Sequence, residues 1–250
     1  SNPYAYGFFP YMTHHQVPRF THTFVINEAG VLPDHYRRKL FGVSPLSSHV
    51  VYSEVSTEGS SFQTKDLGHP LQGTDNWFRP VDIKMGPDGA IYIVDWYNPV
   101  TCHQDDAYRD PARDKAHGRI WRLVHIESAP SIPRAPNLVK APIDGVLEAL
   151  KSPEHWTRYQ AKRALTTRNP DGSVEALDDW IRTLDPKDPR YEHHLFEALG
   201  AFETLEVVRP GLLDRLLQAR DHRARAYAAR VVGRWHDRLD DPLGRLAMRV

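Results

Sequence analysis

The chain has 250 residues, of which 40% are hydrophobic and 26% are charged, a composition typical of a soluble globular protein long enough for two domains. Its 32 Lys and Arg residues equal its 32 Asp and Glu residues, so no global field favours nucleic acid or an anionic membrane. The single Cys102 excludes an internal disulfide and a thiolate metal cluster. No apolar run approaches the roughly 18 residues of a membrane helix, and no signal peptide is visible, so we expect any targeting signal to lie upstream.

A first group of strands is predicted at residues 20–27, 39–43, 49–55 and 61–65. The third segment alternates around Tyr52, and the fourth is a polar outer strand. These segments predict one small sheet.

A second group of strands is predicted within residues 76–123. Val81, Ile83 and Met85 share one face of a strand, and a Gly-Pro-Asp-Gly turn at residues 86–89 leads into the apolar run 90–94. Asp95 follows this run and places a carboxylate at the exit of a buried strand. After about twenty polar residues, a third strand is predicted at residues 118–123.

Each group is typical of one blade of a β-propeller, so residues 1–126 predict a partial propeller of about two blades. Two blades cannot close a ring, and we therefore expect the tail of a larger propeller. In such a blade, the start of the innermost strand and the connection between its second and third strands lie on the ligand-binding face. Residues 75–82 and 97–117 should then share one rim.

A proline-rich linker is predicted at residues 127–142, and the apolar period beyond it becomes helical. Breaks between helices are expected at residues 169–172 and 185–186. Helices are predicted at residues 143–151, 153–167, 173–184, 190–203, 210–219, 222–236 and from 242 onward.

An internal repeat links two of these helical segments at a constant offset of 67 residues. The offset corresponds to two units of about 33 or 34 residues, each a pair of helices, which predicts a HEAT-like α-solenoid over residues 143–250. The matched positions are Leu150, His155, Arg158, Ala161, Arg163 and Leu165 with Leu217, His222, Arg225, Ala228, Arg230 and Val232.

Three segments resemble one known family. FRPVDIKMGPDGAIYIVDWYNP, RDPARDKAHGRIWRL and SPEHWTRYQAKRAL occur in the order found in the planctomycete-type membrane-bound dehydrogenase family, and LPDHYRRKLFGV and GSSFQTK resemble its preceding blade. That family's propeller is similar to the quinoprotein glucose and sorbosone dehydrogenases. The resemblance implies a propeller, six-bladed in this family, followed by HEAT-like repeats, in a periplasmic or cell-envelope-associated oxidoreductase.

The resemblance also implies cofactors. In the quinoprotein relatives, pyrroloquinoline quinone lies above calcium on the top face of the propeller, with a histidine base and arginines nearby. Members often carry a c-type haem domain with a Cys-x-x-Cys-His site. This chain contains no such motif, so any haem belongs to a domain outside it.

The predicted rim contains residue types suited to this chemistry. A histidine accepts a proton near neutral pH, arginine forks bind the carboxylates of a tricarboxylate quinone, and carboxylate and amide oxygens are calcium ligands. The candidates are His103 and His117 as catalytic bases, Arg79, Arg109, Arg113, Arg119 and Trp96 for the cofactor, and Asp95, Asn98, Asp110 and Asp114 for the metal.

Structural alternatives accompany these assignments. The Arg-Asp-Pro-x-Arg-Asp pattern would also serve a long loop that holds itself by ion pairs and capping carboxylates. Asp95 could be a structural blade carboxylate, and Trp96 could pack between blades. His193 and His194 are expected on the surface of the solenoid. The arginine-rich segment 220–234 lacks interleaved aromatic residues, which favours a solvated or docking face over nucleic-acid binding.

Two functions remain open from the sequence. The first is a fragment of a sugar or aldehyde dehydrogenase that binds a carbohydrate-type molecule, with a protein partner or haem domain docking on the solenoid. The second is a non-catalytic module that binds glycans or proteins.

Overall fold

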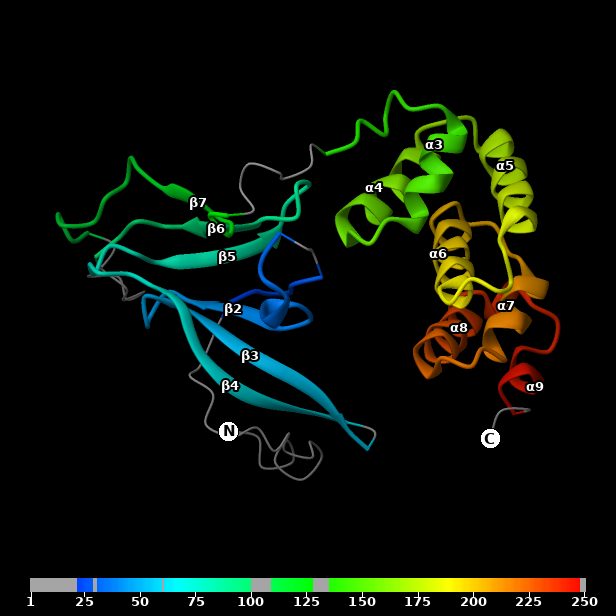
Figure 1. Cartoon of the computed structure of the whole chain (residues 1–250), viewed down its shortest axis with the longest axis horizontal. Coiled ribbons are helices and arrows are strands. Elements are labelled where there is room, and N and C mark those ends of the chain that lie inside the picture. The colour runs from blue at the N-terminus through cyan, green and yellow to red at the C-terminus, as the bar shows by residue number, and fades with distance from the viewer. Residues whose placement is uncertain (1–21, 29–30, 60, 100–108, 128–134, 248–250) are drawn as a thin grey trace. The chain divides into compact units, whose positions relative to one another are not determined.

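The computed structural model describes residues 22–28, 31–59, 61–99, 109–127 and 135–247 (Figure 1). The chain divides into two compact units, residues 1–134 and 135–250. The first unit contains two antiparallel sheets and the second contains helices. Among the described helices, none has the length and apolar character needed to span a bilayer.

The first sheet has four strands in the order β1-β2-β3-β4: β1 (Phe24–Ile26), β2 (Leu40–Ser44), β3 (His49–Glu58) and β4 (Ser61–Gln72). A single 3₁₀ turn, η1 (Asp34–Tyr36), precedes β2. The last two strands run well past their predicted ends as a two-stranded ribbon (Figure 1). Polar residues at 54–58 and 61–65 pair across this ribbon, which the apolar pattern could not reveal.

The second sheet has three strands in the order β5-β6-β7: β5 (Pro80–Met85), β6 (Ile91–Asp95) and β7 (Arg119–Leu123). The predicted turn joins β5 to β6, with Gly89 at a φ of 75° and its N–H bonded to the Gly86 carbonyl at 3.1 Å. Asp88 in this turn accepts hydrogen bonds from Arg122 and Tyr92, which ties β7 to the turn.

The two sheets share one apolar core. The cluster consists of the fully buried Phe41, Val43, Val50, Ile83, Ile91 and Ile93, together with Leu32, Tyr52 and Phe78. The described strands form two separate small sheets and close no ring.

The second unit contains six helices of six residues or more up to residue 234, followed by two short ones. Their bounds are α3 (Ile143–Glu148) with η3 (Ala149–Lys151), α4 (His155–Thr166), α5 (Pro170–Thr183), α6 (Tyr191–Thr204), α7 (Pro210–Leu217), α8 (His222–Arg234), η4 (His236–Arg238) and α9 (Pro242–Ala247). The expected break between the second and third helices is present, since α4 ends at Thr166, but α5 begins at Pro170 and not at the predicted residue 173. A proline there costs nothing, since the first N–H groups of a helix have no intrahelical partner.

The 67-residue offset recurs in the hydrogen bonds. Arg158 donates from Nη1 to the carbonyls of Ser152 and Pro153, and Arg225 donates in the same way to Ala219 and Arg220. Helix α4 contacts α6, α6 contacts α8, and α3 contacts α5. His194 is a correction to the sequence expectation: it is buried in α6, not exposed, because its position faces the helical core.

Candidate functional site

One edge of the second sheet gathers the predicted rim residues. Asp95, at the end of β6, pairs with Pro80 at the start of β5 and with Arg119 at the start of β7. The Asn98 N–H also donates to the Trp77 carbonyl at 3.1 Å. For the described residues of the connection, 97–99 and 109–117, the expectation that they share one rim with the segment before β5 is therefore confirmed.

Asp95 is the hub of this rim. Its Oδ1 accepts the N–H groups of Arg79 and Tyr97 at 2.8 and 2.9 Å, and its Oδ2 accepts Arg119 Nε at 2.7 Å and Trp121 Nε1 at 2.9 Å. Burial raises the pKa of Asp95, but these four donors outweigh it and lower the pKa below its usual range. The carboxylate is thus ionised and saturated with donors.

Arg79 is buried and makes its bonds within the protein. Its Nε donates to the Asn98 carbonyl at 2.9 Å, its Nη2 to Pro99 at 3.3 Å, and its Nη1 to Pro45 and to Ser48 Oγ. The guanidinium therefore fastens the rim to the turn between β2 and β3.

The described part of the β6–β7 connection is held by capping carboxylates. Asp110 Oδ1 accepts the Ala112 N–H at 2.8 Å, and Asp114 Oδ1 accepts the N–H groups of Ala116 and His117. The Asn98 side chain donates to the Asp114 carbonyl at 3.2 Å. These bonds match the structural alternative for a self-supporting loop.

His117 forms a dyad with Asp114. The imidazole Nδ1 lies 2.8 Å from Asp114 Oδ2, and 71% of the His117 side chain is exposed. The hydrogen bond from the Ala116 N–H, followed by that from the His117 side chain, lowers the pKa of Asp114, so the carboxylate is ionised at neutral pH. An ionised carboxylate on Nδ1 selects the tautomer in which Nε2 can accept a proton.

Aromatic rings and guanidinium groups surround the hub. Arg113 lies 4.9 Å from the ring centroid of Trp96, and Arg119 lies 4.1 Å from Tyr97 and 5.1 Å from Trp121. Trp96 and Trp121 remain 38% and 43% exposed. The rim thus presents apolar faces beside cationic hydrogen-bond donors.

Two of the predicted metal donors, Asp95 and Asp114, bond through both carboxylate oxygens to groups of the protein itself. The Asn98 carbonyl accepts a hydrogen bond from Arg79. Among the described residues, no group of three or more His, Cys, Asp or Glu side chains could hold a metal ion.

Two predicted site residues remain, Arg109 and His103. Arg109 is exposed at the start of the described connection, and His103 lies outside the described residues. Sequence reasoning missed Tyr97 and Trp121 as partners of the hub. Alternation along β7 could have identified Trp121, because it is two residues from Arg119 and so lies on the same face.

Residues 7–127 match the model of a domain of unknown function, DUF7133. A search of the curated proteins found no significant match, and neither did a search of the solved structures.

Proposed function

We propose that this rim binds a carbohydrate-type molecule as part of a sugar or aldehyde dehydrogenase. His117 would accept the proton of a bound hydroxyl, and a quinone cofactor held by residues outside the described rim would accept the hydride from the carbon that bears this hydroxyl. The His117–Asp114 dyad is the observation that carries the proposal. Its imidazole is oriented by a carboxylate and open to solvent, which is the arrangement of a general base.

Recognition of the sugar would use the neighbouring indole rings. Sugars present apolar C–H faces and polar hydroxyl edges, and the exposed faces of Trp96 and Trp121 suit the former. Arg113 and Arg119 lie within reach of those rings and can donate to hydroxyl oxygens.

The family resemblance supports the same reading. Under this proposal, the four-stranded and three-stranded sheets are consecutive blades of a propeller, and the helices are HEAT-like repeats of a cell-envelope oxidoreductase. A haem domain would lie outside this chain. The proposal assigns no quinone or calcium ligand to the described rim, because its carboxylates and Arg79 are engaged internally.

A second candidate function is a non-catalytic glycan- or protein-binding module. The internal bonding of the expected metal and cofactor ligands favours it. Both candidates use the same aromatic rim, and they differ only in whether His117 takes part in chemistry.

The test measures two quantities on the full-length protein: calorimetric binding of glucose and related aldoses, and dye-linked oxidation with pyrroloquinoline quinone and calcium supplied. We expect His117→Ala to lower kcat at least about 100-fold with little change in sugar binding. Trp121→Ala should weaken binding. The control is His155→Ala, which alters an exposed histidine of the helical unit.

Each outcome decides between the candidates. If His117→Ala oxidises the sugar as fast as the wild-type protein does, His117 is not the general base. Sugar binding without oxidation by the wild-type protein would leave the binding module, and no sugar binding at all would refute the dehydrogenase and the glycan-binding form of the module.

A further inference from the structure

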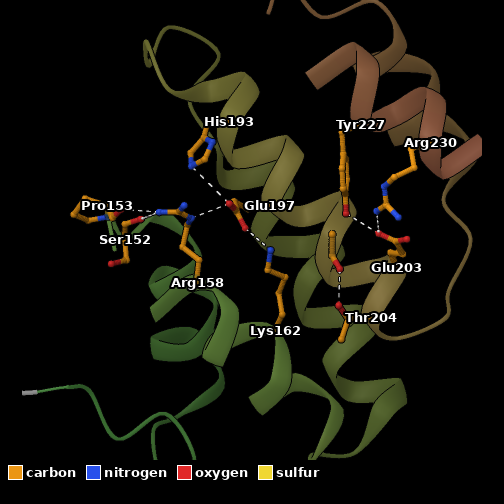
Figure 2. A network of polar contacts seen from close by, with 11 residues as sticks. Ser152, Pro153, Arg158, Lys162, His193, Glu197, Glu203, Thr204, Tyr227 and Arg230 are labelled. Atoms are coloured by element: carbon orange, nitrogen blue, oxygen red, sulfur yellow. Dashed lines mark hydrogen bonds and ion pairs between the residues drawn. The ribbon is translucent and has the colours of Figure 1, made fainter. Parts of the chain in front are cut away.

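Polar contacts join α4 to α6 and α6 to α8 (Figure 2). Lys162 on α4 bonds to Glu197 on α6 at 2.6 Å, and Glu203 on α6 accepts Tyr227 and Arg230 from α8, each at 2.7 Å. We define a cationic face on these three helices by Lys162, Arg163, Phe196, Tyr227, Arg230 and Arg234.

Charge is unevenly divided between the helices of this unit. Helices α4, α6 and α8 contain seven Lys or Arg and three Asp or Glu, whereas α3, α5 and α7 contain two and seven. The seven basic residues belong to α4 and α8, and the three acidic residues belong to α6, which contacts both of those helices. The three helices together therefore carry a net positive charge.

The acidic side chains of α6 that make these contacts are also more buried than the basic side chain of Arg230. The side chains of Glu197 and Glu203 are 2% and 16% exposed, but the Arg230 side chain is 57% exposed. Arg163 is exposed as well, and the described residues supply it with a ring contact to Tyr159 but no carboxylate. At Arg230 the cation is therefore more exposed than its carboxylate partner, whereas Arg234 pairs at 2.6 Å with Glu206, whose side chain is 53% exposed.

Aromatic rings lie between these cations. Phe196 and Tyr227 contact each other with centroids 4.4 Å apart, and burial, then Glu203, raise the pKa of Tyr227, which remains a neutral donor. Gly200 makes room for this arrangement, since a Cβ there would lie 3.1 Å from Tyr227 Oη and 3.3 Å from Lys162 Nζ. The sequence alone did not show these interleaved rings, because they come from two different helices.

We propose that the cationic face binds an acidic peptide segment of a protein partner. Carboxylates spaced along such a segment would pair with Arg163, Arg230 and Arg234, and apolar side chains between them would pack on Phe196 and Tyr227. Charge complementarity is the argument for this occupant. A nucleic acid is the alternative anionic occupant, and the test below includes it.

The test is fluorescence anisotropy of the full chain with a labelled peptide of repeated Glu-Glu-Leu, at low and at physiological salt. We expect saturable binding that weakens with salt, and a loss of about tenfold in affinity for the double variant Arg163→Ala and Arg230→Ala. The conservative pair Arg163→Lys and Arg230→Lys should retain most of the binding, and a thermal melt checks that each variant is folded.

The control removes the same charge elsewhere. Arg182→Ala with Arg215→Ala, on α5 and α7, should leave the affinity unchanged. An equal loss in this control, no binding by the wild-type chain, or tighter binding of a single-stranded oligonucleotide with the same arginine dependence would overturn the proposal. Self-association that is abolished by the Arg163→Ala and Arg230→Ala pair would instead identify a second copy as the occupant and would also refute the acidic peptide.

Discussion

Each unit of the protein contains one buried carboxylate that organises its surroundings, and the two are satisfied differently. Asp95 in the sheet unit accepts two backbone N–H groups, one indole and one guanidinium. Glu197 in the helical unit lies between two full cations, with Arg158 Nε at 2.8 Å and Lys162 Nζ at 2.6 Å. The first is mostly a hydrogen-bond hub, and the second is an ion-pair hub.

The difference reflects what each carboxylate joins. The donors to Asp95 belong to one sheet edge and set the path of the backbone at residues 79 and 97. The donors to Glu197 are side chains of another helix, so they dock α4 on α6 without changing the path of either backbone. Loss of Asp95 should therefore disturb the rim itself, whereas loss of a partner of Glu197 should weaken a helix contact.

The largest effect is expected for Asp95→Ala, which leaves buried donors without an acceptor. We expect the free energy of unfolding of the sheet unit to fall by about 3–5 kcal/mol, measured by urea denaturation followed through tryptophan fluorescence. Asp110→Ala is the matched control, since its carboxylate caps one exposed turn, and it should cost about 1 kcal/mol or less. Equal losses in the two variants would contradict the hub role.

An intermediate effect should separate the two equivalent arginines of the helical repeat. Both bond the same pair of upstream carbonyls, but Arg158 is buried and also pairs with Glu197, whereas Arg225 is exposed. We expect Arg158→Ala to cost about 2–4 kcal/mol and Arg225→Ala about 1 kcal/mol, measured by urea denaturation followed through circular dichroism. If the two substitutions cost the same, the ion pair with Glu197 contributes nothing beyond the carbonyl bonds.

The smallest effect is expected at the N-cap of α8, where Asp221 accepts the Arg223 N–H at 2.8 Å. The Arg223 side chain, followed by its N–H, overcomes burial and lowers the pKa of Asp221 to about 2. Because the folded pKa lies below the unfolded value, this stabilisation is present above about pH 4 and is lost as the pH falls toward about 2.

Asp221→Ala should therefore lower stability by about 1 kcal/mol at pH 6. The gap from the wild-type protein should close between about pH 4 and pH 2. Urea midpoints over this range measure the gap, and a difference that does not change with pH would contradict the assignment.

The sequence by itself determined the local elements. Alternation located β5, a continuous apolar run located β6, and the Gly-Pro-Asp-Gly turn gave the connection between them. The helical period located the main helices within a few residues of their observed bounds. These features depend on neighbouring residues, so a linear pattern contains them. The shared rim of Arg79, Asp95 and Arg119 also followed, because the edges of an antiparallel sheet are set by strand direction.

Only the tertiary structure decided what each polar side chain does. Asp114 was predicted as a metal ligand, but its carboxylate bonds to the His117 ring. Arg79 was predicted to bind a cofactor, but it donates to backbone carbonyls. His194 was expected at the surface, but it is buried. The reason is that a charged group takes whichever donors and acceptors burial brings within about 3 Å. Those partners come from separate strands and helices, and no sequence period encodes their meeting.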